Sequence, residues 1–104
     1  MLRVFLHVGP FIEDKSDFFK KINTFLDIAS SHNHKVILVL FDDCWKGTYH
    51  MGQQPDPIPG VHNSQWVQCP GDNNISISIL EDYTKTVINV FKDDERVVMW
   101  DLYN

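Results

Sequence analysis

The chain has 104 residues, of which 43% are hydrophobic and 22% charged, the balance of a single soluble globular domain rather than a disordered segment. Fourteen acidic against nine basic residues give a formal charge of -5, and no run of Lys or Arg forms a stripe that would follow a phosphate backbone. Nucleic acid is therefore disfavoured as a partner, and we expect none. The longest apolar run is far too short to cross a bilayer and the N-terminus lacks the parts of a signal peptide, so we expect no membrane partner, and the localisation is left open.

The first third of the chain predicts a strand followed by a helix. Residues 2–8 are rich in β-formers, and Gly9-Pro10 is expected to end that strand. Over residues 16–32, apolar side chains recur at three- and four-residue spacing with polar ones between them, which predicts an amphipathic helix. Ser16 is the expected N-cap, and Asn33 is expected to close the helix in the left-handed conformation.

The rest of the chain predicts two more strands, one helix and a long loop. Residues 36–41 form an unbroken apolar strand, the pattern of a strand covered on both faces in a parallel sheet. Residues 42–77 show neither period and carry most of the prolines and glycines, so they predict a loop. A capping-box pattern at Ser78 opens a second amphipathic helix over 78–92, and 97–103 is the third strand.

This order, β-α-β-long loop-α-β, predicts the α/β class, with right-handed crossovers and parallel strands in a single unit over residues 1–104. A loop of this length is uncommon in a compact domain and is usually functional. It leaves the C-terminal end of a parallel strand, which is the edge where α/β barrels and open α/β sheets place their active sites.

The residues directly after the second strand are the first candidates for chemistry. Asp42 and Asp43 are paired acids that suit acid/base work or a metal, and Trp45 beside them suits stacking on a sugar ring. The alternative is a solvated strand end with a packing tryptophan. The loop continues with histidines, amides and indoles, His62 and Trp66 among them, a mixture that suits hydroxyl-rich ligands but also occurs in any solvated loop.

Metal and cofactor sites are not expected. Asp42, Asp43, Cys44, His50 and His62 lack the close spacing of a zinc motif, and the chain has no glycine-rich phosphate loop. Cys44 and Cys69 are either bridged or two unpaired thiols, and the sequence leaves both possibilities open.

Arg3 and His7 belong to the first predicted strand. Arg3 stands among apolar neighbours, either at an exposed strand start or, in a barrel, pointing inward toward a carboxylate. His7 lies near the end of the strand, where it either reaches the same mouth or is a satisfied interior histidine.

Four stretches of this chain together resemble glycoside hydrolase family 5, the retaining (β/α)8-barrel glycosidases that include cellulases, mannanases and related enzymes. The stretches are LRVFLH, VILVLFDDCW, QPDPIPGVHNSQWVQCPG and DDERVVMWDLYN. The resemblance implies a partial (β/α)8 barrel that comprises strands two to four. It also implies a parent enzyme that hydrolyses β-linked oligo- or polysaccharide, in a family whose members are often secreted.

Two positions carry over from the family pattern. Asn104 matches an asparagine expected to hydrogen-bond the sugar 2-hydroxyl, and Arg3 matches an arginine that supports the nucleophile's hydrogen bonds. The resemblance further places substrate-binding side chains along the barrel mouth, at His7, Asp42, Asp43, Trp45, His62, Trp66 and Asn104. It implies that both catalytic glutamates lie outside this sequence, the first directly after Asn104, so we expect the chain alone to be inactive as a hydrolase.

Three strands cannot close a barrel, so we expect the inner face of the sheet to be open and the isolated fragment to be marginally folded, to self-associate or to aggregate. An alternative reading is a non-catalytic carbohydrate-binding or oligomerising barrel piece. A small open α/β domain of the Rossmann-like or flavodoxin-like type is a third reading, although the glycine-rich first turn of such nucleotide sites is absent.

Overall fold

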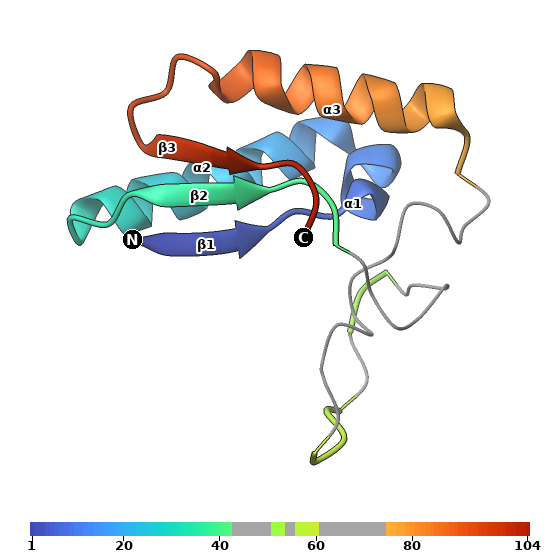
Figure 1. Cartoon of the computed structure of the whole chain (residues 1–104), viewed down its shortest axis with the longest axis horizontal. Helices are drawn as coiled ribbons and strands as arrows, with labels where there is room; N and C mark the ends of the chain where they lie inside the picture. Colours follow the sequence, from blue (N-terminus) through green and yellow to red (C-terminus); the bar gives the residue numbers. More distant parts are fainter. Residues whose placement is uncertain (43–50, 54–55, 61–74) are drawn as a thin grey trace.

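The computed structural model describes residues 1–42, 51–53, 56–60 and 75–104. Three strands, β1 (Leu2–Phe5), β2 (Val36–Val39) and β3 (Val97–Asp101), form one sheet in the order β1-β2-β3. Both strand pairs are parallel, with Leu2 opposite Val36 and Leu38 opposite Trp100 in the register. The expected mixed α/β architecture with a parallel sheet is confirmed (Figure 1).

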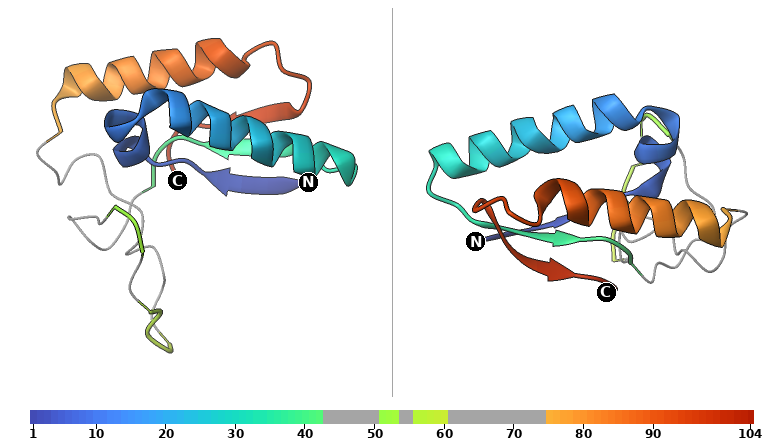
Figure 2. Two further views of the ribbon diagram at one scale, coloured as in Figure 1. Left: turned by 180° about the vertical axis from the view of Figure 1, so that it is seen from behind. Right: turned by 90° about the horizontal axis from the view of Figure 1, so that it is seen from above.

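Three helices pack on one side of this sheet. They are α1 (Val8–Glu13), α2 (Lys15–Ser31) and α3 (Ile77–Phe91). Figures 1 and 2 show α2 and α3 on the same face, and seen from that side both β-α-β connections are right-handed, as expected. The other face carries no helix among the described residues.

The core lies between the sheet and the helices. Alternate residues of β2 and its continuation, Val36, Leu38 and Leu40, are almost completely buried against the apolar stripes of α2 and α3. Tyr83 of α3 is fully buried, and its hydroxyl donates to the Leu40 carbonyl oxygen at 3.1 Å. Burial also raises the pKa of this phenol, so Tyr83 acts as a neutral anchor between α3 and the end of β2.

The strands are shorter than predicted, because each prediction continued into the polar or irregular residues that follow the paired segment. The first strand ends at Phe5 rather than at residue 8, the second at Val39 rather than 41, and the third at Asp101 rather than 103. Gly9-Pro10, which was expected to end the first strand, instead lies in the first turn of α1, and the strand ends earlier at Phe5. Proline is tolerated there because the first amides of a helix have no intrahelical partner.

The two long helices match their predictions closely, but their N-caps differ. Asp14, not Ser16, caps α2, and its carboxylate accepts from the Asp17 amide at 3.0 Å. Ser76, rather than Ser78, caps α3. Asn33 follows α2 with φ 59°, which confirms the left-handed helix end.

The predicted loop of residues 42–77 ends one residue early, at the start of α3, and its described parts contain neither helix nor strand.

Candidate functional site

Polar side chains gather where β2 and β3 end. Asp101 is the last residue of β3, while Asp42 and Asn104 each follow a strand by three residues. Asp42 is only 6% exposed, and it is the one buried charged side chain among the described residues. Because the strands are parallel, their C-terminal ends meet at one edge of the sheet (Figure 1).

These side chains and Arg3 of β1 form one hydrogen-bonded chain. Arg3 Nη2 donates to Asn104 Oδ1 at 2.8 Å and also forms an ion pair with the Asp101 carboxylate. Asn104 Nδ2 donates to Asp42 Oδ1 at 2.7 Å, and the Asn104 backbone amide donates to the Phe41 carbonyl oxygen at 3.0 Å. We call Arg3, Asp42, Asp101 and Asn104 the polar cluster.

The alternation of side chains along each strand places the cluster on the face that carries no helix. Val4 and Trp100 pack against the core, so their neighbours Arg3 and Asp101 point to the opposite face. The guanidinium of Arg3 lies over the Phe5 ring, 5.1 Å from its centroid. Both features expected of Arg3 occur together, since its side chain is 44% exposed near the start of β1 and also pairs with the Asp101 carboxylate on this face.

The Arg3–Asp101 ion pair joins the two outer strands across β2. Strands two positions apart in a sheet are separated by about 9.5 Å, a span that a long arginine side chain and a short carboxylate bridge together. The pair crosses the face on which Val39 lies, and Val39 is fully buried although no helix of the described residues covers it. The cluster thus presents its polar groups on the same face as this buried side chain.

The cluster offers both donors and acceptors to a ligand. Two carboxylates, one guanidinium and one carboxamide carry a formal charge of about -1 at neutral pH. The Arg3 side chain is 44% exposed and that of Asp101 26%, so ligand groups can reach the cluster from solvent. Such a set can hydrogen-bond hydroxyl groups.

His7 lies at the N-terminus of α1 rather than in the polar cluster. Its Nδ1 accepts from the Gly9 amide at 2.8 Å, which makes it the N-cap of that helix. Burial lowers the pKa of His7 and keeps the ring neutral. The ring borders a pocket of about 310 Å³ between β1 and α2 whose other lining residues include Phe18, Ile22 and Phe25. The capping contact accounts for a histidine at this position, and its role as a substrate ligand stays a prediction.

The predicted loop candidates Asp43, Trp45, His62 and Trp66 lie outside the described residues, as do Cys44, His50 and Cys69. Their roles therefore stay predictions. Among the described residues, no three His, Cys, Asp or Glu side chains come close enough to hold a metal ion. No helix in this part of the chain has the length and apolar character needed to span a bilayer.

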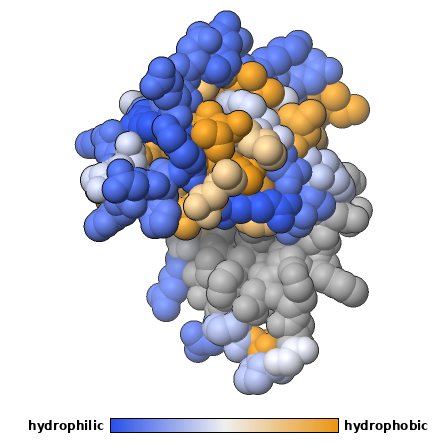
Figure 3. All heavy atoms as spheres, turned by 60° about the vertical axis from the view of Figure 1, so that its left-hand side comes forward, coloured by the Kyte–Doolittle hydropathy of each residue, from blue (hydrophilic) through white to orange (hydrophobic). Residues whose placement is uncertain are grey.

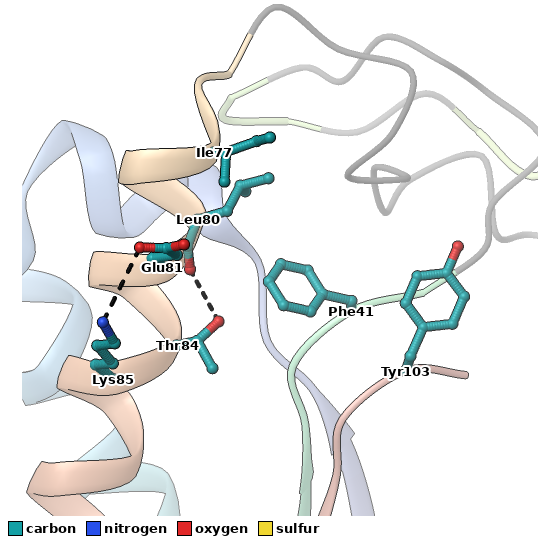
Figure 4. A pocket seen from close by; sticks show the side chains of 7 residues that line it. All are labelled: Phe41, Ile77, Leu80, Glu81, Thr84, Lys85 and Tyr103. Carbon is teal, nitrogen blue, oxygen red and sulfur yellow. Dashed lines mark hydrogen bonds and ion pairs between the residues drawn. The ribbon is translucent and has the colours of Figure 1, made fainter.

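A second pocket, of about 400 Å³, was not anticipated from the sequence. Figure 4 shows it between the N-terminal half of α3 and the ends of β2 and β3, with the Phe41 and Tyr103 rings on one side. Its other lining residues are Ile77, Leu80, Glu81, Thr84 and Lys85. The floor of the pocket is apolar. Glu81 and Lys85 of α3 lie at the rim of the pocket, with Lys85 Nζ 4.0 Å from Glu81 Oε2.

Asp101 is the one member of the polar cluster that was not selected as a candidate. Side chains alternate along β3, so Asp101 lies on the same face as Met99. Met99 is aligned with Ile37 of β2, and Ile37 is aligned with Arg3, so this alternation could have placed Asp101 on the face of Arg3.

Comparison with protein-family models, with curated proteins and with solved structures finds no match for this chain.

Proposed function

We propose that this chain is part of a retaining glycoside hydrolase of the family 5 type and contributes strands two to four of a (β/α)8 barrel. In this proposal the polar cluster lines the barrel mouth and binds a β-linked polysaccharide. The observation that supports it is the contact between Arg3 and Asn104, the two residues that the resemblance carried over, which lie 101 positions apart and hydrogen-bond at 2.8 Å. Their meeting point is the C-terminal edge of a parallel sheet, the active-site edge of such barrels.

The arrangement of the layers also supports a barrel segment. The strands follow one another in chain order, and all three helices lie on one side. In a barrel the helices form the outer ring and the opposite face points inward. A doubly wound sheet covers that second face with further helices, whereas here no helix of the described residues covers it, and it bears the Arg3–Asp101 ion pair beside apolar side chains such as Met99.

The chain's own share in this function is to bind substrate rather than to cleave it. Retaining hydrolysis uses two carboxylates about 5 Å apart, and the resemblance carries neither over to this sequence. The three glutamates of the chain are Glu13 in α1, Glu81 in α3 and Glu95 just before β3, and none of them contacts the polar cluster. We therefore expect no release of reducing sugar by the chain alone.

The test is a titration of the ¹⁵N-labelled chain with cello-, xylo- and mannohexaose, followed by NMR. We expect millimolar binding, about 4 kcal/mol, with the largest shifts at the amides of Asp42 and Asn104. Arg3→Gln should weaken it, while Lys20→Gln, at an exposed position of α2, serves as the matched control. The proposal fails if maltohexaose, an α-linked control, shifts the same amides equally, or if no β-linked hexaose shifts them at about 10 mM.

A second candidate is an oligomerising barrel piece. It is favoured by the large apolar side chains that stay exposed on the outer strands, Phe5 on β1 and Val98 and Met99 on β3. Figure 3 shows apolar side chains gathered between hydrophilic ones on one side of the molecule. Such a piece would bury these side chains against another copy instead of binding sugar, and it predicts concentration-dependent association with no response to the hexaoses.

A further inference from the structure

The Asn104 carboxamide is held at both of its ends. A carboxamide is almost symmetrical in shape, and only its partners decide which end is nitrogen. Here the partners leave one choice. Ionised Asp42 can only accept and therefore faces Nδ2, at 2.7 Å, while Arg3 can only donate and therefore faces Oδ1, at 2.8 Å.

We infer that Asp42 is a positioning residue that, together with Arg3, fixes the Asn104 carboxamide in one orientation for a ligand hydroxyl. Asp42 itself is 6% exposed, so a ligand approaching from solvent meets Asn104, which is exposed, before it meets Asp42. The backbone bond from the Asn104 amide to the Phe41 carbonyl oxygen ties the two segments together next to Asp42.

Half of the carboxamide's hydrogen-bonding capacity is left over for a ligand. Nδ2 has two hydrogens and Oδ1 two lone pairs, and the cluster uses one of each. One donor and one acceptor therefore remain on the same carboxamide, and a secondary hydroxyl can use both kinds of site, because its single oxygen accepts and donates. The inference rests on the proposed function, because it takes that hydroxyl to belong to a sugar.

An amide without these partners would turn over about χ2 and present nitrogen and oxygen in turn. A ligand would then have to fix the orientation itself, at a cost in binding. The role of Asp42 is thus to remove that cost before the ligand arrives. A buried carboxylate that served packing alone would not determine the orientation of the Asn104 carboxamide, that is, the positions of its Nδ2 and Oδ1 atoms.

The first measurement is hydrogen exchange of the Asn104 side-chain amide in the free chain, with the exposed Asn33 side chain as the internal reference. Wild-type Asn104 should exchange about tenfold more slowly than Asn33. Asp42→Leu removes the acceptor at similar volume and should abolish the difference, and Asp42→Asn should give an intermediate rate. Asp82→Leu is the matched control, since Asp82 is an exposed aspartate of α3 that pairs with Lys15 and does not contact Asn104.

The second measurement is binding of the β-linked hexaose that binds best to the wild type. Asp42→Leu should weaken binding about tenfold and Asp82→Leu, outside the polar cluster, should leave it unchanged, with protection of the Leu40 backbone amide verifying that each variant is folded. If folded Asp42→Leu leaves both the Asn104 exchange rate and the affinity unchanged, the inference is overturned. A wild-type chain that protects the Asn104 amide yet binds no hexaose overturns the proposed function instead.

Discussion

Arg96 makes the largest number of polar contacts of any side chain at the N-terminal edge of the sheet. Its guanidinium bonds to Asp94 at 2.6 and 2.9 Å, to Asp27 of α2 at 2.6 Å and to Asn23 at 3.0 Å. The side chains of Arg96 and Asp94 are 24% and 19% exposed. The hydrogen bond from Arg96 is the main reason why the pKa of Asp94 lies below its ordinary value, and the same bond raises the pKa of Arg96. Arg96 therefore connects α2 to the turn between α3 and β3.

We predict that Arg96→Ala lowers the free energy of unfolding by about 1–2 kcal/mol, because several charge-assisted hydrogen bonds are lost together. Arg96→Lys should lower the free energy of unfolding by less, and Lys20→Ala, on the exposed face of α2, should leave it almost unchanged. Since the pKa of Asp94 is lowered in the fold, its contribution is complete above pH 3.8 and is lost as the pH falls through the lowered value. Urea unfolding at pH 7 and pH 3 measures both effects, and an Arg96→Ala penalty that persists undiminished at pH 3 contradicts the explanation.

The sequence identified most of the residues at the polar cluster, but not their contacts. Asp42 could be placed at the functional edge because it directly follows a continuous apolar strand, and Arg3 and Asn104 came from the family resemblance. Asn104 can bridge Arg3 and Asp42 only because of the parallel register of the three strands. This register aligns residues of β1 and β2 that are about 35 positions apart and residues of β2 and β3 that are about 60 positions apart, and no local sequence pattern encodes it. Asp101 was overlooked because the strand was predicted to run two residues past it.

At the scale of elements, the least predictable one is α1. The six residues of this helix are too few to show a helical period, and they include Gly9 and Pro10, which favour a turn when read locally. The two longer helices show four or more turns of regular spacing, and their predicted bounds differ from the structure by one residue at each end. Short elements that depend on caps and tertiary packing escape sequence patterns, whereas long amphipathic ones do not.

We predict that the stability of the chain falls as the pH drops below 6.5, through His7 in the N-cap position of α1. Burial lowers the pKa of His7, so the unfolded chain takes up a proton before the folded chain does. Stability is then complete above pH 6.5, declines below it and levels off beneath the lowered pKa. The expected loss between pH 7.5 and pH 5.5 is about 0.5 kcal/mol, because the ring is only partly buried.

The variant that checks this is His7→Asn, since asparagine is a good N-cap that does not titrate in this range. Urea unfolding of both proteins at the two pH values should show a smaller loss in the variant. Equal losses would assign the pH dependence to other groups.

At the scale of the whole molecule, the described part of the chain is a layer of helices packed on one face of a three-stranded sheet. β1 and β3 are the outer strands in the order β1-β2-β3, so among the described residues each has one edge without a strand partner. Apolar side chains on these strands stay exposed, including Phe5 at 39%, Val98 at 46% and Met99 at 56%. Leaving a large apolar side chain in water forgoes roughly 1.5–3 kcal/mol, a sizeable part of the 5–15 kcal/mol that stabilises a typical domain.

We predict that this surface drives self-association of the isolated chain. Exposed strand edges with apolar side chains pair with other chains, and lysine on an edge strand opposes such pairing. Met99→Lys should therefore reduce the rise of the sedimentation coefficient between about 10 μM and about 1 mM, a range that brackets weak dimers. Ile28→Lys is the matched control, because Ile28 is also 56% exposed but lies on α2. If the two variants behave alike, hydrophobicity in general rather than the edge of β3 is responsible, and a wild-type chain that stays monomeric throughout removes the prediction altogether.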